Sequence, residues 1–249
     1  AYYIGFVIAL AVIAASYTIL GGLKAVVWTD VIQSVLLLLA GIGVAILAFD
    51  KVGGWNQMIA LDRAAGASAK MHLYLPMNHP SLPWTGVLTG LMALHCFYWG
   101  TNQFIVQRAL GARSDVEARV GIIFAGFLKL LIPFFAIAAG IAAMYLFRRE
   151  LPDEEVAPDT AFPVAVKLLI PAGYGLIGLI GAGLIGAILS SIDSMMNSCA
   201  TIITIDVYKR YIHPQATEKE MILVGRISIL ILMVVAAVLA IWILDPNSE

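Results

Sequence analysis

The chain has 249 residues, of which 61% are hydrophobic and only 12% charged, and its mean hydropathy is +0.93. Soluble domains carry about twice that share of charged residues, so the composition excludes an ordinary soluble protein and predicts one embedded in a lipid bilayer. The net charge is −1 and no basic patch is present, so no binding of nucleic acid is expected.

Six apolar stretches are each near or above the roughly 20 residues that a helix needs to cross about 30 Å of hydrocarbon. They cover residues 2–20, 26–48, 84–110, 120–147, 173–205 and 221–244. We therefore predict an all-α integral membrane protein in which residues 1–249 form a single transmembrane domain. The first stretch lacks a charged leader and the last ends close to Glu249, so we expect a fragment of a larger polypeptide.

Three short connections between these stretches carry lysine and arginine, and the long connections, which also hold Lys51, Arg63, Lys70, Arg148 and Arg149, count less for orientation. The short connections hold Lys24, then Arg108, Arg113 and Arg119, then Lys209, Arg210 and Lys219. If the helices alternate in direction, these connections share one side, and the enrichment of cationic residues in cytoplasmic loops makes that side the cytoplasm. Both ends of the chain and the long connections 49–83 and 148–172 are then predicted outside, in the extracellular space or periplasm. The segment 162–171 is too short to span the membrane, so we expect it to form a helix at the membrane interface.

The first connection carries a carboxylate into the second apolar stretch. Gly21 and Gly22 are expected to break the helix, and Asp30 then lies about one turn inside the next one. An acid near a helix N-terminus is favoured by the helix dipole, which by itself would explain Asp30. Ionisable groups inside a membrane are also functional candidates, so binding of a cation or pairing with a buried base stays open.

The third apolar stretch is interrupted near its middle by polar and aromatic residues. Aromatic residues often serve only packing, but Gly100 and the amides of Asn102 and Gln103 favour a broken helix, by which transporters expose backbone groups to a solute. His95 has no second histidine three or four residues on, so a metal site there is not expected.

Lys129 lies ten residues beyond Arg119, too deep in its stretch for an anchor at a helix end. Its side chain would have to reach across much of about 15 Å of helix to meet the cytoplasm. We therefore predict that it faces the interior of the helix bundle, with a carboxylate or a substrate hydroxyl as its partner. Pro133, four residues later, permits a kink and frees a backbone carbonyl.

Residues 187–198 place seven small or polar side chains in an apolar stretch. Ser190 and Ser194 share one helical face, and the hydroxyl and carbonyl oxygens of such a segment suit a hard cation. The serines could instead return hydrogen bonds to the preceding turn or allow close helix packing, as the neighbouring glycines at 181, 183 and 186 also would. Asp193 favours a functional cluster, because packing does not require a charge.

Four stretches of the chain resemble the sodium:solute symporter family, most closely its sodium/glucose cotransporter branch. They are residues 17–33, residues 82–86, residues 98–103 with 106–108, and residues 190–198 with 206–208. The resemblance implies a LeuT-like core of two inverted five-helix repeats. This chain would supply part of that core, about six transmembrane helices, and its partners would include the missing helices of the same polypeptide.

The same resemblance implies sodium as the coupling ion, bound at a main site and, in some members of the family, at a second site. The main sodium ion would bind the backbone carbonyl of Ala187, the hydroxyls of Ser190 and Ser191, and carbonyls from a helix outside this chain. A second sodium ion would bind the carboxylate of Asp30 together with side chains of the fifth apolar stretch. Those side chains are Ser190, Asp193 and Ser194.

For the solute, the resemblance implies that Tyr98 is the inner aromatic gate, that Trp99 is its neighbour, and that Lys129 donates hydrogen bonds to sugar hydroxyls. His95 falls where a sugar-binding member can have asparagine. Asparagine offers two donors and an acceptor on one amide, which a neutral imidazole does not, so this difference changes the expected hydrogen-bond pattern.

These observations predict sodium-coupled symport of a small polar solute, a sugar or polyol, by alternating access. A symporter for an amino acid, a carboxylate or another anion, and a solute sensor built on the same membrane core, are the alternatives. An intramembrane enzyme using Asp30, Asp193 and His95 is not favoured, because it would need those groups within hydrogen-bond reach of one another.

Overall fold

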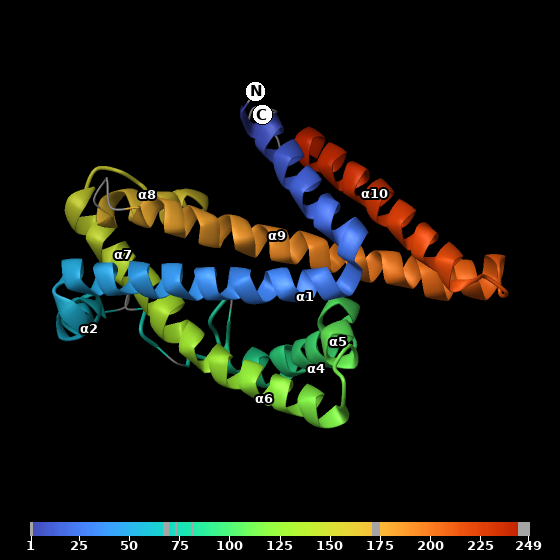
Figure 1. Ribbon diagram of the computed structural model, residues 1–249. Coiled ribbons are helices and arrows are strands. Elements are labelled where there is room, and N and C mark those ends of the chain that lie inside the picture. The colour runs from blue at the N-terminus through green and yellow to red at the C-terminus, as the bar shows by residue number, and fades with distance from the viewer. Residues whose placement is uncertain (1, 67–69, 73, 81, 171–174, 244–249) are drawn as a thin grey trace. The chain divides into compact units, whose positions relative to one another are not determined.

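The computed structural model describes residues 2–66, 70–72, 74–80, 82–170 and 175–243, and this part of the chain contains helices and no strand (Figure 1). The α-helices are α1 (Tyr2–Val52), α2 (Gly54–Ala64), α3 (Trp84–Gly86), α4 (Met92–Gly100), α5 (Gln103–Leu110), α6 (Asp115–Ile132), α7 (Ala138–Glu150), α8 (Ala161–Leu169), α9 (Leu176–Ile202) and α10 (Glu218–Ile243). Three π-helical segments, η2 (Val87–Leu91), η3 (Pro133–Ile137) and η5 (Ile203–Ile212), and one 3-10 turn, η4 (Pro158–Thr160), adjoin them.

Four continuous helical stretches within the described residues are long and apolar enough to cross a membrane. They are Tyr2–Val52, Asp115–Glu150, Leu176–Ile212 and Glu218–Ile243. The predicted stretches 2–20 and 26–48 both lie in the first of these, and 84–110 is absent from the set because its helix is divided. The six crossings, the sides of the loops and the single transmembrane domain stay predictions.

The predicted helix breaks are both present. Gly22 lies inside α1 with φ 54° and ψ −151°, a conformation that only glycine adopts easily, and Figure 1 shows the bend in α1. In the third apolar stretch, α4 ends at Gly100 and α5 begins at Gln103. Both the kink between the first two stretches and the break beside Gly100 are therefore confirmed.

The chain divides into two compact units. The first unit comprises Ala1–Val35, Gln103–Gly111 and Leu184–Glu249, and the second comprises Leu36–Asn102 and Ala112–Gly183. The helices α1 and α9 each contribute residues to both units. Asp30 and Asp193 belong to the first unit, and Lys129 belongs to the second.

In the first unit, the N-terminal arm of α1 lies beside α10 and packs on α9 (Figure 1). The hydroxyl of Tyr3 donates to the carbonyl of Ala240 at 3.0 Å. One buried apolar cluster joins three helices, with Leu10 and Ala14 from α1, Leu189 from α9 and Met233 from α10. These contacts hold the polar middle of α9 against α1.

In the second unit, small residues allow α1, α7, α8 and α9 to pack closely. Its buried core contains seven alanines: Ala40, Ala45, Ala48, Ala139, Ala142, Ala143 and Ala165. A Cβ added at Gly183 would lie 3.1 Å from the Cβ of Ala40. In the first unit, a Cβ at Gly186 would lie 3.1 Å from Gln33, whereas one at Gly181 would meet nothing within 4 Å. Close packing is thus confirmed for two of the three glycines.

Asp62 anchors part of the connection between α2 and α3 in the second unit. Its side chain is buried, and it accepts hydrogen bonds from the backbone N–H of Lys70 at 2.7 Å, from that of Met71 at 3.2 Å and from the Tyr145 hydroxyl at 2.7 Å. Burial by itself would raise the pKa of Asp62, but these hydrogen bonds outweigh it and hold the pKa below its usual value.

Asp62→Asn is expected to lower the free energy of unfolding by about 1–3 kcal/mol at pH 7, because an amide replaces a charged acceptor that faces three donors. Since the folded state lowers the pKa, the stabilisation is present above the unfolded-state value of about 4 and is lost as the pH falls through the folded-state value. Thermal unfolding in detergent at pH 7 and at about pH 3 measures both effects.

The matched control is Asp50→Asn, which changes an exposed aspartate at the end of α1 in the same unit. It is expected to leave the unfolding temperature unchanged. Equal effects of the two substitutions at pH 7 would show that Asp62 does not anchor the connection.

Candidate functional site

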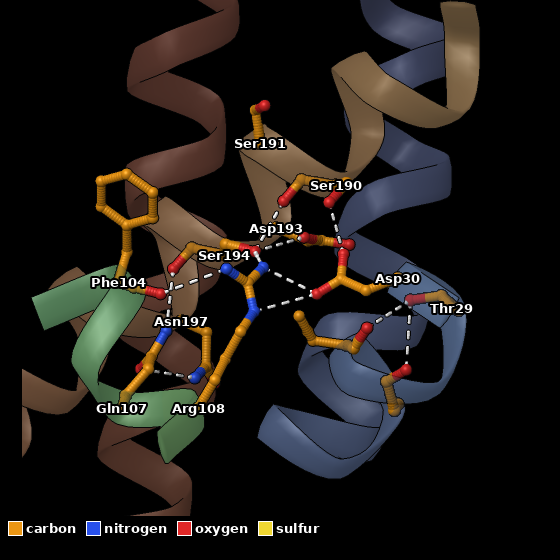
Figure 2. Close-up of polar contacts among 12 residues, drawn as sticks. Thr29, Asp30, Phe104, Gln107, Arg108, Ser190, Ser191, Asp193, Ser194 and Asn197 are labelled. Atoms are coloured by element: carbon orange, nitrogen blue, oxygen red, sulfur yellow. Dashed lines mark hydrogen bonds and ion pairs between the residues drawn. The ribbon is translucent and has the colours of Figure 1, made fainter. Parts of the chain in front are cut away.

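The middle of α9 carries a polar cluster in the first unit, and Figure 2 shows its side chains turned toward α1 and α5. The hydroxyl of Ser190 donates to Oδ1 of Asp30 on α1. Arg108 on α5 forms an ion pair with Oδ2 of the same carboxylate, with Nη2 at 2.7 Å. Asp30 therefore pairs with a base, one of the two roles left open by its position in the chain.

Arg108 makes further contacts that orient its guanidinium. Its Nε lies 3.2 Å from Oδ2 of Asp30, and Nη2 also donates to the hydroxyl of Ser194. Nη1 donates to the carbonyl of Phe104 at 3.4 Å. The side chains of Arg108 and Asp30 are only 32% and 14% exposed, so this pair is less screened by solvent than a surface salt bridge.

Asp193 is fully buried beside this ion pair. Its carboxylate accepts the hydroxyl of Tyr17 at 2.5 Å, and its Oδ1 lies 3.2 Å from the hydroxyl oxygen of Ser194. The structure thus brings together Asp30, Ser190, Asp193 and Ser194, the four side chains considered for a second sodium ion, although they come from helices far apart in the chain.

Gln107 attaches α5 to α9 next to the cluster. Its side chain is buried, its Nε2 donates to the carbonyl of Ser194 at 3.3 Å, and its Oε1 accepts from Nδ2 of Asn197 at 3.3 Å. These hydrogen bonds pack α5 on α9 and bring both Gln107 and Arg108 to the cluster.

The residues considered for the main sodium ion lie on two sides of α9. Ser190 faces Asp30, whereas the hydroxyl of Ser191 points away from the cluster and donates to the carbonyl of Ala187 at 3.1 Å (Figure 2). Ser194 returns a hydrogen bond to the carbonyl of Ser190 at 2.6 Å. The predicted hydrogen bond to the preceding turn is thus confirmed for Ser191 and Ser194. Ser190 donates instead to Asp30 on α1.

A polar row on α9 and η5 leads from the cluster to a cavity. Its side chains recur every three or four residues, at Ser190, Ser194, Asn197, Thr201 and Thr204. The cavity has a volume of about 710 Å³ and lies within the first unit. Its polar lining includes Thr18, Gln107, Asn197, Thr201, Thr204 and Arg226.

Two hydroxyls in the wall of this cavity have no hydrogen-bond partner among the described residues. They belong to Thr18 and Thr204, whose residues are 0% and 7% exposed. A buried hydroxyl without a partner costs about 1–3 kcal/mol, and water in a cavity of this size removes that cost. The polar row therefore ends at a cavity whose unpaired hydroxyls can bind water.

The residues considered for the solute lie in the second unit. Nζ of Lys129 on α6 lies 4.3 Å from the ring centroid of Trp99 and 5.6 Å from that of Tyr98 on α4. The two rings are packed edge to face with centroids 5.3 Å apart. His95 lies one turn earlier on α4 with an exposed side chain. The contacts described for Lys129 are thus aromatic rings, and its predicted contact with a substrate hydroxyl stays a prediction.

A π-helical turn follows Lys129. It begins at Pro133, whose ring nitrogen cannot donate to the carbonyl four residues back. This agrees with the predicted irregularity after Lys129.

Sequence reasoning missed the roles of Arg108, Gln107, Asn197 and Tyr17 in the charged cluster. The available signal was the pair of intramembrane carboxylates, Asp30 and Asp193, because buried acids require donors or a base. Arg108 was the base nearest to the end of a broken apolar stretch, but its pairing with one particular acid could not be read from spacing.

Long apolar helices with a charged, hydrogen-bonded cluster between them are typical of integral membrane proteins with a functional site inside the helix bundle. The solved structure of a Na⁺-coupled sialic acid symporter in its substrate-bound outward-open state superposes with a TM-score of 0.86 at 22% identity, covering 98% of this chain and 52% of that one. The fold is therefore a partial LeuT-like core, all-α and integral to the membrane.

The chain belongs to the sodium:solute symporter family, whose sequence profile matches residues 1–248. It is 38% identical to the sodium/glucose cotransporter of Vibrio parahaemolyticus, covering 94% of this chain and 46% of that protein. It is 32% identical to the sodium/myo-inositol cotransporter 2 of Homo sapiens, covering 92% of this chain and 37% of that protein. These relatives are transport proteins and not enzymes. The chain spans less than half the length of either.

Proposed function

We propose that this chain carries the ion-binding and solute-binding helices of a symporter that couples inward sodium movement to uptake of a small polar solute, a sugar or polyol. The observation that carries the proposal is the row of oxygen-bearing side chains on α9, bonded to Asp30 and Arg108 inside an otherwise apolar helix pair. Membership of the family and the named glucose and myo-inositol cotransporters support the ion and the class of solute.

The main sodium ion is assigned to the carbonyl of Ala187 and the hydroxyls of Ser190 and Ser191. Sodium is a hard cation and prefers oxygen ligands. Ser190 gives its hydrogen to Asp30 and Ser191 gives its hydrogen to Ala187, so each hydroxyl oxygen keeps lone pairs for a cation.

A second group of oxygens comes from Asp30, Ser190, Asp193 and Ser194, which were considered above as ligands of a second sodium ion. This group already contains one fixed cation, the guanidinium of Arg108. Any sodium ion at this position would have to share the carboxylate of Asp30 with it.

The solute is assigned to His95, Tyr98, Trp99 and Lys129. Aromatic faces suit the apolar faces of sugar and cyclitol rings, and an ammonium donates to their hydroxyls. The position of Lys129 over Trp99 supports this use, because a cation held over an aromatic face keeps donors available to a bound hydroxyl.

Alternating access fits the helix breaks at Gly22 and after Gly100 and the cavity at the end of the polar row, because broken helices and water-filled cavities accompany such transport. One sodium ion crossing 100 mV supplies about 2.3 kcal/mol, and each tenfold gradient adds about 1.4 kcal/mol. Together these allow roughly several hundredfold accumulation of the solute.

The protein is assigned to the cell membrane, with the lysine- and arginine-rich connections in the cytoplasm and both ends of this chain outside. The lysines and arginines of the short connections support this orientation, because long loops count less.

Uptake of a panel of radiolabelled solutes into proteoliposomes tests the function. Uptake of a sugar or polyol is expected with external sodium and is expected to fall to background when choline replaces sodium. Sodium-dependent uptake restricted to an amino acid, a carboxylate or an anion would contradict the solute class. Solute binding without any uptake would contradict transport and favour a sensor.

A further inference from the structure

One turn of α9 is bonded to α1 on both sides of the kink at Gly22. On the arm of α1 before the kink, the hydroxyl of Tyr17 donates to Oδ2 of Asp193 at 2.5 Å. On the arm after the kink, Oδ1 of Asp30 accepts the hydroxyl of Ser190. Ser190 and Asp193 are three residues apart, so the two arms of α1 bond to neighbouring positions of one helix.

The bond from Tyr17 orients a carboxylate that has no access to solvent. Asp193 is 0% exposed, and its other oxygen, Oδ1, lies 3.2 Å from the hydroxyl oxygen of Ser194. That hydroxyl has a single hydrogen, and the carbonyl of Ser190 is a nearer acceptor for it, at 2.6 Å. The hydroxyl of Tyr17 is therefore the main side-chain donor to Asp193 among the described residues.

The turn that Tyr17 holds carries the hydroxyls assigned to the main sodium ion. Ser190 and Ser191 lie three and two residues before Asp193, so any rotation of α9 about its axis moves all three side chains together. A bond from one arm of α1 restrains this turn at one point, whereas bonds from both arms restrain it at two. The orientation of the serine hydroxyls therefore depends on the bend of α1 at Gly22.

We propose that Tyr17 is a positioning residue for the main sodium site, because through Asp193 it fixes the turn of α9 that presents Ser190 and Ser191 to the ion. This rests on the proposed function, since it names a residue that supports the sodium site of that transport. Sodium binding then favours the bend of α1 in which the bond between Tyr17 and Asp193 is formed, because an ion stabilises the conformation that orients its ligands.

Tyr17→Phe in the full-length protein tests the proposal, because it removes the hydroxyl and keeps the ring. Equilibrium binding of radioactive sodium without solute is expected to need about five- to tenfold more sodium for half-saturation. In proteoliposomes, the maximal uptake rate and the KM for solute at saturating sodium are expected to stay within about twofold of wild type, since saturating sodium restores the oriented site. A purely structural defect would instead lower the maximal rate and leave the sodium midpoint unchanged.

The matched control is Tyr3→Phe, which removes a hydroxyl from the same arm of α1. Tyr3 donates to the carbonyl of Ala240 on α10 at 3.0 Å and not to α9, so sodium binding is expected to stay at its wild-type value. Asp193→Leu removes the acceptor of the Tyr17 hydroxyl. Tyr17→Phe is expected to have no further effect on sodium binding when it is added to Asp193→Leu, because both changes remove the same bond.

A second measurement keeps the hydroxyl of Tyr17 in place. Fluorotyrosine incorporated at position 17 reports on its surroundings by fluorine NMR. Sodium added without solute is expected to shift this resonance with the midpoint of sodium binding, and potassium is expected to leave it unchanged. A resonance that does not respond to sodium would overturn the proposal even if Tyr17→Phe does not fold.

Wild-type sodium binding in Tyr17→Phe would overturn the proposal, and so would a further loss when Tyr17→Phe is added to Asp193→Leu. Equal losses for Tyr17→Phe and Tyr3→Phe would also overturn it, because they would show a general effect of the packing of this arm. A protein whose sodium binding depends on Tyr17 as expected, but which takes up no solute, contradicts the proposed transport function and supports the role of Tyr17.

Discussion

Ser191→Ala is expected to weaken sodium activation of uptake by about ten- to hundredfold, because a hydroxyl ligand of a cation contributes about 1.5–3 kcal/mol. The lost group is the one that points away from the charged cluster and bonds only to the Ala187 carbonyl among its described contacts. The concentration of sodium that gives half-maximal uptake measures the effect, and sodium binding without solute measures it independently.

The matched control is Ser16→Ala. Ser16 also bonds back to a helix carbonyl, that of Ile13 at 2.7 Å, and it lies on α1 outside the charged cluster. It is expected to leave sodium activation unchanged. A Ser191→Ala protein with wild-type sodium activation would remove Ser191 from the main sodium site.

Lys129→Ala is expected to raise the KM for solute by about ten- to hundredfold, because it removes a charged donor to the solute hydroxyls. Sodium binding measured without solute is expected to stay near its wild-type value, since Lys129 belongs to the second unit and the serine cluster to the first. Lys129→Arg keeps the charge over Trp99 and is expected to recover part of the affinity. Initial rates at saturating sodium and varied solute give the KM.

Lys167→Gln serves as the control for loss of a lysine charge. Lys167 is an exposed residue of α8 in the same unit, whereas the residues assigned to the solute lie on α4 and α6. Its substitution is expected to leave the KM unchanged. Equal KM values for wild type and Lys129→Ala would place the solute elsewhere.

The local features of this chain were predictable because they depend on residues close together in sequence. Gly22 predicted the kink in α1, since glycine adopts a positive φ easily. Gly100 together with the amides of Asn102 and Gln103 predicted the break after α4. The serines predicted both hydrogen bonds to the preceding turn and a polar face on α9. Their two orientations, with Ser190 toward α1 and Ser191 away, follow from the 100° step of a helix only once the packing face of α9 is known.

The contacts of the charged side chains were not predictable in the same way. The position of Lys129 in the chain did not predict its contacts with the rings of Trp99 and Tyr98. Nor did the sequence predict that Gln107 is buried against α9. Both depend on which helices pack together, and hydropathy does not encode that.

The sequence by itself determined that this protein lies in a membrane, that it is helical, and that oxygen-bearing residues interrupt its fifth apolar stretch, because composition and periodicity are properties of the local chain. Only the tertiary structure decided that Arg108 pairs with Asp30, which lies 78 residues away. Several acids and bases in the sequence could have paired, and their charges are compatible in many combinations. Packing of α5 and α9 against α1 selects one of them, because a buried ion pair requires contact distances that only the assembled helices provide.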